Sequence, residues 1–216
     1  MKKIAAFSCL FLSFYTLCFS QTKVLQFRAV LTEQESQSTP FDKYIDNFGK
    51  EILVDKEVLL SNKDIDKIGI VKASREFPNE SLLVVAFTNS GKGRFFEVTK
   101  ESLNKRLAII VDDNVLTAPY IIEAIDTGQT MIPVSSFNAA EELIKHLGFA
   151  PYLHGNLYDS SDEDDSYRFG KYAMEIGRQE IAEEIVLQIY KYNPKSEFSQ
   201  KLIKEYPSLG RIVPKE

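Results

Sequence analysis

Residues 96–147 read FEVTKESLNKRLAIIVDDNVLTAPYIIEAIDTGQTMIPVSSFNAAEELIKHL, and this stretch decides the fold. Within it, Leu107–Val111 is continuously apolar and mostly β-branched, which favours a central strand covered on both faces. Asp113 and Asn114 tolerate a positive φ, so they predict a tight turn into a second strand at Val115–Ala118. The centre of the stretch therefore indicates a β-hairpin.

The rest of the stretch predicts two more strands and a helix. Tyr120–Ile125 and Thr130–Val134 are strand-like and are separated by a turn at Thr127-Gly128. Asn138 is a suitable N-cap for a helix that runs to Leu147. The stretch thus combines hairpins with a closing helix.

The upstream residues show the same mixture of strands and short helices. Gly49 would end one helix, and Ser61 with Asp64 forms a capping pattern for another. A Pro78-Asn79 turn would separate two strands. Clustered strands with interspersed helices indicate an α+β fold, in which helices cover a mainly antiparallel sheet. The expected strands are 24–31, 51–60, 68–73 and 82–87, and the expected helices are 41–48, 61–67 and, after a loop at 89–93, 94–104.

Beyond residue 148 the sequence changes character. Pro151, Gly155 and the acidic run DSSDEDD at 159–165 predict a solvated linker. A tail with helices at 167–176 and 179–192, and a third capped by Ser196, follows. The expected divisions are a signal peptide at 1–20, an N-terminal strand and linker region at 21–57, an α+β domain at 58–148, an acidic linker at 149–165 and a helical hairpin and tail at 166–216.

The first twenty residues predict a secretory signal. Lys2 and Lys3 precede a mostly apolar run, Ile4–Leu17, and Cys18-Phe19-Ser20 presents small residues to signal peptidase before Gln21. A retained membrane anchor is one alternative, but the run is short for a span. Lipidation of Cys18 is another, and it would tether the protein without a span. We therefore expect an exported protein, periplasmic or secreted.

Charge and cysteine content narrow the classes of function. The 216-residue chain has a net charge of −5, and loss of Lys2 and Lys3 with the signal would lower it by two, to −7. Such a charge argues against nucleic acid and anionic lipid as partners. Both cysteines, Cys9 and Cys18, lie in the signal, so no disulfide is expected in the mature chain. No later segment is long and apolar enough to cross a bilayer.

Five motifs follow one another between residues 58 and 147, namely Val58–Ile65 (VLLSNKDI), Leu107–Asp112 (LAIIVD), Thr117–Pro119 (TAP), Thr127–Gln129 (TGQ) and Phe137–Leu143 (FNAAEEL). In this order and spacing they resemble the head of the first periplasmic domain of SecD, a subunit of the bacterial protein-export machinery. The sequence departs from the family pattern at two turns. Asn104-Lys105 stands where the family has Gly-Lys, and Gly128 is one glycine of a family pair.

The resemblance implies a non-enzymatic domain. In SecD the head is thought to move against the membrane part and to hold an emerging polypeptide, with power from proton flow through carboxylates in transmembrane helices. Because this sequence shows no such helices, the resemblance implies the binding role without the motor. The expected partner is a protein or an unfolded polypeptide, and no cofactor is expected.

Four apolar residues near the predicted hairpin are candidate polypeptide-binding residues. Tyr120, Ile122, Met131 and Phe137 would form a groove for an extended apolar segment if they lie exposed together. Methionine and aromatic side chains adapt to varied sequences. Ordinary core packing is the alternative.

Motifs for catalysis and metal binding are weak. His146 and His154 could join the acidic run as metal ligands, but the run lacks the spacing and the glycine of an EF-hand loop. Ser90–Gly93 lacks the GxxxxGK[ST] spacing of a phosphate loop. We therefore expect no metal site and no enzymatic activity.

The tail has features of a single tetratricopeptide repeat. Gly170, Gly177, Ala182 and Pro194 fall at that repeat's spacings, although Ser166 stands where the repeat has a large aromatic residue. One such unit cannot bury its face alone. A helical hairpin docked on the α+β domain is one interpretation, and a partner-binding surface is the other.

These observations predict a non-catalytic, exported binding module that holds polypeptide or an envelope protein partner and is linked to protein export. The alternative is a scaffold or accessory subunit that acts through its helical tail. Loss of binding on deletion of the tail would favour the second.

Overall fold

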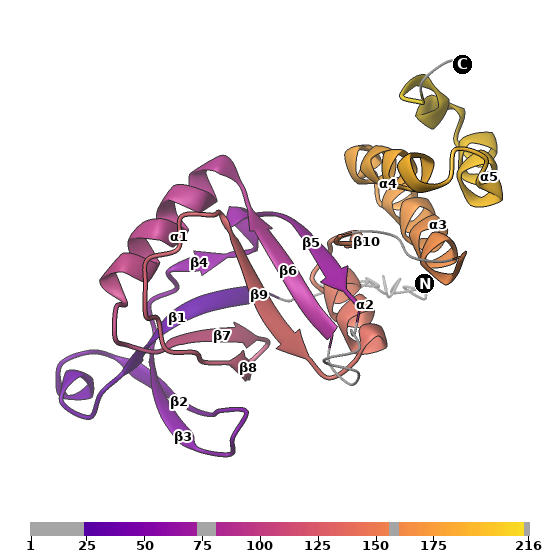
Figure 1. The fold of residues 1–216 in the computed structure, drawn as a ribbon. Helices are drawn as coiled ribbons and strands as arrows, with labels where there is room; N and C mark the ends of the chain where they lie inside the picture. The colour runs from indigo at the N-terminus through magenta and orange to yellow at the C-terminus, as the bar shows by residue number, and fades with distance from the viewer. Residues whose placement is uncertain (1–23, 73–80, 156–159, 214–216) are drawn as a thin grey trace, which may run out of the picture.

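The computed structural model describes residues 24–72, 81–155 and 160–213 (Figure 1). The predicted signal at 1–20, with Cys18, and the predicted Pro78-Asn79 turn lie outside these residues. Within them the α+β prediction is confirmed, because two mainly antiparallel sheets and two helices are followed by a helical tail. In the described ranges no helix is long and apolar enough to span a membrane.

The larger sheet is built around β1 and β7. Its path runs β2-β3-β1-β7-β8, and β4 also pairs with β1. β1 and β7 are antiparallel, with Phe27 opposite Ile109. All five residues of β7 are buried, as the apolar run predicted. The strands are β1 (Leu25–Leu31), β2 (Phe41–Ile45), β3 (Glu51–Asp55), β4 (Leu60–Ser61), β7 (Leu107–Val111) and β8 (Asn114–Thr117).

The smaller sheet has the order β10-β5-β6-β9. β6 pairs with β5 and β9 in antiparallel register, whereas β10 adds to β5 in parallel. β10 therefore covers the backbone edge that β5 would otherwise expose. The strands are β5 (Ile65–Val71), β6 (Ser81–Phe87), β9 (Gln129–Val134) and β10 (Pro151–Leu153).

Two helices close the main core. α1 (Asn89–Glu101) follows a Thr88 N-cap and α2 (Phe137–His146) follows a Ser136 N-cap. Buried residues of both helices pack with one face of each sheet. Three phenylalanine rings in mutual contact belong to this core: Phe27, Phe87 and Phe95.

The β2–β3 hairpin makes a second, smaller core on the other face of the larger sheet. Ile52 and Val54 of β3 pack with Ala108 and Ile110 of β7. Successive side chains of β7 therefore pack into two different cores, since its odd-numbered residues face the main one.

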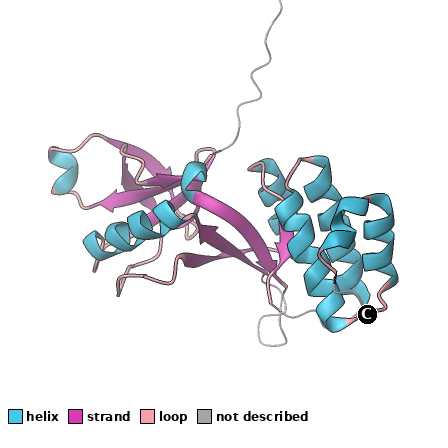
Figure 2. Cartoon of the chain, turned by 90° about the horizontal axis from the view of Figure 1, so that it is seen from above, coloured by secondary structure: helices cyan, strands magenta, loops and turns pink. Residues whose placement is uncertain are grey.

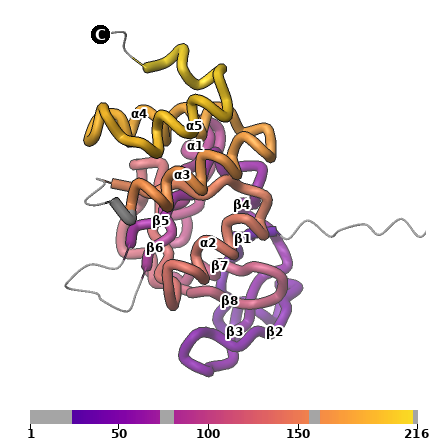
Figure 3. Tube along the Cα trace, turned by 90° about the vertical axis from the view of Figure 1, so that its right-hand side faces the viewer, coloured from indigo at the N-terminus to yellow at the C-terminus, as the bar shows by residue number. Residues whose placement is uncertain are grey.

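The tail consists of three helices and a 3₁₀ turn. These elements are α3 (Ser160–Glu175), α4 (Gln179–Tyr192), α5 (Glu197–Glu205) and η3 (Pro207–Arg211). They gather on one side of the sheets (Figure 2), at the end of the molecule opposite the β2–β3 hairpin (Figure 3). Their buried apolar residues belong to the same cluster as the main core, so the tail is docked rather than tethered.

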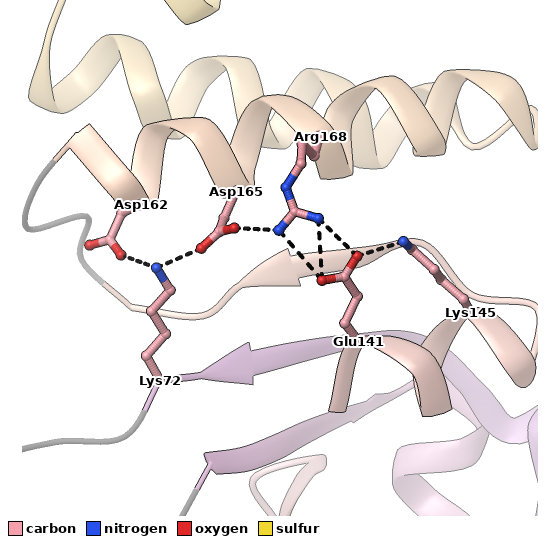
Figure 4. Close-up of polar contacts among 6 residues, drawn as sticks. All are labelled: Lys72, Glu141, Lys145, Asp162, Asp165 and Arg168. Atoms are coloured by element: carbon pink, nitrogen blue, oxygen red, sulfur yellow. Dashed lines mark hydrogen bonds and ion pairs between the residues drawn. The ribbon is translucent and has the colours of Figure 1, made fainter. Parts of the chain in front are cut away.

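Six charged side chains reinforce this docking (Figure 4). The ammonium group of Lys72, at the end of β5, lies 2.6 and 2.7 Å from two carboxylates of α3. The guanidinium group of Arg168, on α3, lies 3.2 Å from Glu141 on α2. Burial lowers the pKa of Lys72, but the two carboxylates outweigh it and the pKa is raised. The set comprises Lys72, Glu141, Lys145, Asp162, Asp165 and Arg168.

Three expectations for the first half of the domain are wrong. Residues 41–48 form no helix, because Tyr44 pairs with Ile52 and the segment is the first strand of a hairpin. The helix expected at 61–67 is one 3₁₀ turn, η2 (Asn62–Asp64), before β5; the Ser61–Asp64 capping box is present. The loop expected at 89–93 is the first turn of α1. A further 3₁₀ turn, η1 (Glu35–Gln37), lies in the loop before β2.

The second half also differs from expectation. Tyr120–Ile125 is not a strand, since only two isolated bridges form, at Tyr120 and Ile121. The N-cap of α2 is Ser136, not Asn138. The expected linker at 149–165 contains β10, and most of its acidic run lies in the first turns of α3. Ion pairing with Lys72 explains why this run folds.

Candidate functional site

The first two candidate residues lie at one end of the larger sheet. Tyr120 follows Pro119 and forms an isolated antiparallel bridge with Arg106. Ile121 points inward, which leaves Tyr120 and Ile122 outward with 68% and 84% of their surface exposed. Tyr120 and Ile122 are therefore not core residues, and apolar side chains exposed next to one another can mark an interaction site.

The turn of the β2–β3 hairpin reaches the same end of the sheet. The carboxylate of Asp46 lies 2.8 Å from the guanidinium group of Arg106, the bridge partner of Tyr120. Phe48, in the turn, has 84% of its surface exposed, and Ile45 is also exposed. We call Ile45, Phe48, Tyr120 and Ile122 the Tyr120 surface.

Asp46 holds the hairpin turn in place. One carboxylate oxygen accepts hydrogen bonds from the backbone N–H groups of Phe48 and Lys50, while the other accepts from Arg106. Arg106 and these backbone groups lower the pKa of Asp46, so its carboxylate stays charged. The turn therefore presents Phe48 from a fixed backbone, which reduces the entropy lost on binding.

A second arginine fixes the base of the hairpin. The buried guanidinium group of Arg28 lies 2.8 Å from the carboxylate of Asp42 and donates to the carbonyl oxygen of Asp55. It also donates to the hydroxyl of Tyr44 at 3.1 Å. Both ends of the hairpin are thus tied to the β1–β7 part of the sheet.

A pocket of about 370 Å³ opens beside the Tyr120 surface. Its walls come from the end of β1, the start of β3 and the turn between α1 and β7, and Tyr120 completes the rim. Aliphatic side chains alternate with lysine and glutamate around it, a mixture that suits a polypeptide segment. The lining residues are Val30–Glu33, Lys50–Leu53, Asn104–Arg106 and Tyr120.

Hydrogen bonds hold the charged side chains at this pocket in place. Glu35 accepts hydrogen bonds from the Thr32 backbone N–H and hydroxyl, and from the Lys105 ammonium group at 2.9 Å. These contacts lower the pKa of Glu35 to about 2, with the Thr32 N–H making the largest contribution. The pocket wall at Lys105 is therefore held by a charged pair at neutral pH.

The other two candidate residues lie elsewhere. Met131 is 57% exposed on β9, at the edge of the smaller sheet opposite Val84. Phe137 is only partly exposed: it stacks on Phe169 of α3, with centroids 6.0 Å apart, under the ammonium group of Lys72. Phe137 therefore contributes to the docking of the tail.

Sequence analysis missed Ile45 and Phe48. The segment was predicted to be a helix, in which neither residue would have stood out. The signal was the run Asp46-Asn47-Phe48-Gly49 between two alternating segments, because Asp, Asn and Gly favour hairpin turns. Gly49 adopts a φ of 77°, as such a turn requires.

The residues considered for metal binding have other contacts. Asp162 is paired with Lys72, and His146 lies 3.2 Å from Asp112. Among the described residues, no group of three or more His, Cys, Asp or Glu could hold a metal ion. Ser90–Gly93 forms the first turn of α1, where the Thr88 hydroxyl accepts from the Gly91 N–H.

Comparison with known proteins identifies relatives of the α+β domain. Protein translocase subunit SecD of Calditerrivibrio nitroreducens is 44% identical over 62 residues, which are 29% of this chain and 12% of that protein. SecD of Rickettsia prowazekii is 41% identical over 83 residues, 38% of this chain and 15% of that protein. SecDF of Thermus thermophilus is 45% identical over 60 residues, 27% of this chain and 8% of that protein. The matches thus span a small part of these relatives.

A solved structure of SecDF, described as a membrane component that enhances protein export, aligns at 29% identity with a TM-score of 0.46. The alignment covers 59% of this chain and 62% of the other. A second, the crystal structure of SecDF in a super-membrane-facing form, aligns at 24% identity with a TM-score of 0.45, over 89% of this chain and 28% of the other.

The family model for the SecDF P1 head subdomain matches residues 35–148. The matched range starts upstream of Val58, so it includes the β2–β3 hairpin and most of the residues that line the pocket beside the Tyr120 surface. It ends before β10 and the tail. Because this range is more than half of the 216-residue chain, the chain belongs to the SecDF P1 head subdomain family.

Proposed function

We propose that this protein is a non-catalytic binding module of the cell envelope, linked to protein export, that holds an extended polypeptide segment or an envelope protein partner. The Tyr120 surface and its pocket would make the contact. The observation that carries the proposal is the exposure of Phe48, Tyr120 and Ile122 at one end of a head subdomain.

Several features support binding at this place. Aromatic and aliphatic anchors around a mixed pocket are typical of surfaces that recognise apolar peptide segments. The anchors project from a hairpin that Arg28 and Arg106 hold in place. Met131 would provide a second contact on the edge of the smaller sheet.

The proposed location follows from the N-terminal sequence and the family. A signal at 1–20 would export the chain to the periplasm or beyond, and Cys18 would provide a lipid anchor if it is modified instead. The N-terminal mass of the native protein distinguishes these outcomes. A start at Gln21 means cleavage, and a diacylglycerol on Cys18 means anchoring.

The test is photocrosslinking in the native envelope. A photoreactive residue is placed at Tyr120 or at Ile122, and matched controls carry it at exposed Glu97 on α1. Many unrelated exported chains captured at Tyr120 would support polypeptide holding, and one stoichiometric product would support a dedicated partner. Equal capture at Glu97 and at the Tyr120 surface would contradict the proposal.

Substitution provides a second readout. Phe48→Ser and Ile122→Ser should each weaken binding of an unfolded model polypeptide by about tenfold, since each removes an apolar anchor. Leu187→Ser on α4 is the matched control, because Leu187 is also exposed but belongs to the tail.

The second candidate function is that of an accessory subunit acting through the tail. It is favoured by the exposure of Leu187 and Tyr192 on α4. Deletion of the tail would uncover the core residues that it shares with the α+β domain, so it cannot separate the two functions. Crosslinking from Leu187 separates them: a product there and none at Tyr120 would favour the tail.

A further inference from the structure

The outer edge of β2 carries a regular row of unpaired backbone groups. β2 lies at one end of the larger sheet and pairs with β3 alone. The N–H group of Asp46 donates to the carbonyl oxygen of Lys50, which fixes the phase of this ladder. Because the direction of the backbone groups alternates along an antiparallel strand, Phe41, Lys43 and Ile45 turn theirs away from β3. None of these groups is hydrogen-bonded to another residue that the structure describes.

The other strands at the ends of the two sheets are protected against the addition of a strand. Helix α3 packs against β10. On β9, Pro133 lies where an outward N–H group would be needed, and proline has none. A bulge at Leu116 interrupts β8. These are the usual protections of a sheet edge, whereas β2 has neither proline nor bulge, and its outward Lys43 is paired with Glu51.

A groove of about 610 Å³ lies along the open edge. Its walls are Asp42–Ile45 of β2 on one side, and Asp113–Val115 at the start of β8 on the other. β2 and β8 are the two ends of one sheet path, and they approach each other without a ladder between them. The larger sheet therefore curls until its two ends face each other across the groove.

The second core reaches this groove from both sides. Tyr44 of β2 and Val115 of β8 pack against that core but are only partly buried. The hydroxyl of Tyr44 accepts a hydrogen bond from the buried guanidinium group of Arg28, which holds its ring in place. An apolar side chain placed between Tyr44 and Val115 would be removed from water and would extend the core.

The charges at the groove favour a basic ligand over an acidic one. Asp42 is paired with Arg28, and Lys43 with Glu51. Asp113, on the β8 side, has no ion-pair partner within the described ranges. Its carboxylate therefore remains available to a cation of the ligand.

From these observations we propose that an extended polypeptide segment with basic rather than acidic residues adds to β2 as an antiparallel strand in this groove. Its backbone would bond to Phe41, Lys43 and Ile45, and every second side chain would pack between Tyr44 and Val115. All neighbouring strands along the sheet path are antiparallel, so β2 and β8 run in the same direction, and an added antiparallel segment suits both. Since the backbone provides the bonds, segments of varied sequence fit.

This inference deepens the proposed function and rests on it for the nature of the ligand. Ile45 belongs both to the open edge and to the Tyr120 surface, so a segment bound along β2 reaches that surface. The new element is the mode of binding, through backbone hydrogen bonds to a named strand. The tests therefore separate loss of this mode from loss of polypeptide binding.

The first test measures amide hydrogen exchange by NMR in the ¹⁵N-labelled protein. The probe is the peptide acetyl-Lys-Thr-Val-Thr-Val-Thr-Lys-amide. In the free protein the amides of Lys43 and Ile45 should exchange rapidly, whereas the amide of Tyr44 is protected by β3. Saturating peptide should slow exchange at Lys43 and Ile45 by at least about tenfold and change Tyr44 little.

Two other outcomes contradict the inference in different ways. Saturable shifts at Tyr120 and Ile122 without protection of Lys43 would overturn strand addition and leave the proposed function intact. The absence of a saturable shift at either place, with millimolar peptide, would count against both.

Backbone methylation of the peptide provides a second test that leaves the protein unchanged. In the proposed pairing the threonine side chains lie on the outer face with that of Lys43, so their N–H groups face β2, and the valine N–H groups point away. N-methylation of the central threonine should weaken binding by about tenfold, and N-methylation of the valine that follows it by less than about twofold. Equal effects at the two positions would exclude strand addition.

The charge preference is tested at Asp113. Asp113→Asn removes the charge and keeps a side chain that tolerates a positive φ. It should weaken binding of the lysine peptide by up to about fivefold, whereas Asp126→Asn, at an exposed residue outside the groove, should not. The same peptide with glutamate at both ends should bind the wild type more weakly, and this difference should shrink in Asp113→Asn. An unchanged difference would show that Asp113 does not select the charge.

Discussion

Single arginines hold the α+β domain together at three places. Arg28 lies on β1, Arg94 on α1 and Arg106 just before β7. Each combines a carboxylate with a backbone carbonyl oxygen at a strand end or loop. The planar guanidinium group is suited to such double contacts, which lysine cannot reproduce. The pairs are Arg28 with Asp42, Arg94 with Asp64 and Arg106 with Asp46.

Glu35 provides a residue-scale test of the pocket beside Tyr120. Its pKa is lowered from 4.5 to about 2, so its contribution to stability is complete above pH 4.5 and disappears as the pH falls toward 2. Lys105→Gln should raise this pKa but leave it below 4.5, because the Thr32 N–H still donates. NMR titration of the Glu35 carboxyl measures the change. Lys100→Gln on α1 is the control, and an unchanged pKa in Lys105→Gln would contradict the contact.

At the scale of elements, turn residues determine how the hairpins close. The β7–β8 turn is formed by Asp112 and Asp113, with φ values of 46° and 65°. Sequence analysis placed it one residue later, at Asp113 and Asn114, because all three residues tolerate a positive φ. Cross-strand pairing of Val111 with Asn114 decided between these registers.

Asp113→Gly should therefore stabilise the hairpin. Two consecutive positive φ values are typical of a type I′ turn, in which glycine is preferred at the second position. We expect the free energy of unfolding to rise by up to about 1 kcal/mol. Asp126→Gly, at an exposed loop residue without a positive φ, should lower it slightly. Urea unfolding measures both, and a loss of stability in Asp113→Gly would show that Asp113 is needed for more than the turn.

The packing of α3 against α5 depends on a close approach at Gly170. A Cβ there would lie 2.6 Å from a methyl carbon of Leu202, which is fully buried. Gly170→Ala should therefore lower the free energy of unfolding by about 1–3 kcal/mol. Gly93→Ala in α1 is the matched control: nothing lies within 4 Å of its Cβ position, so it should raise stability by about 0.5–1 kcal/mol. Equal stability of both variants would contradict the close contact.

At the scale of the whole molecule, the tail and the α+β domain form one cooperative unit. They share an apolar core and the six-residue charge network. A protein built in this way is expected to unfold in a single transition. A pocket of about 440 Å³ between the smaller sheet and α4 exists only in the docked arrangement, because its walls come from both parts.

Glu141→Ala tests this docking. The Glu141 carboxylate is shared by Arg168 and Lys145 and is mostly buried, so its loss leaves Lys145 without its carboxylate and Arg168 with Asp165 alone. We expect the free energy of unfolding to fall by about 1–3 kcal/mol. The neighbouring exposed Glu142→Ala should change it by less than about 0.5 kcal/mol. Far-ultraviolet circular dichroism in urea measures both, and two separate transitions in the wild type would contradict the single unit.

Patterns local to the sequence were sufficient for the α+β class, for β7 as a covered strand and for the helices of the tail. The strand β7 follows from a continuous apolar run, and the tail helices follow from periodic apolar residues and caps such as Ser196. Patterns that require a distant partner were misread. The segment 41–48 became a strand through β3, and the acidic run pairs with Lys72 of β5 from the first turns of α3. Of the four candidate residues, Tyr120, Ile122 and Met131 are exposed, whereas Phe137 lies against the tail.

The sequence by itself therefore determined the family resemblance, the class of fold and the order of most elements, because these follow from spacing along the chain. The tertiary structure decided which apolar side chains stay exposed and which cation pairs with the acidic run. It also decided that Tyr152 lies beneath α4. These outcomes depend on residues far apart in the sequence, such as Lys67 and Glu184, meeting in space. A local sequence pattern does not show which distant residues will meet, or how much free energy their contacts contribute.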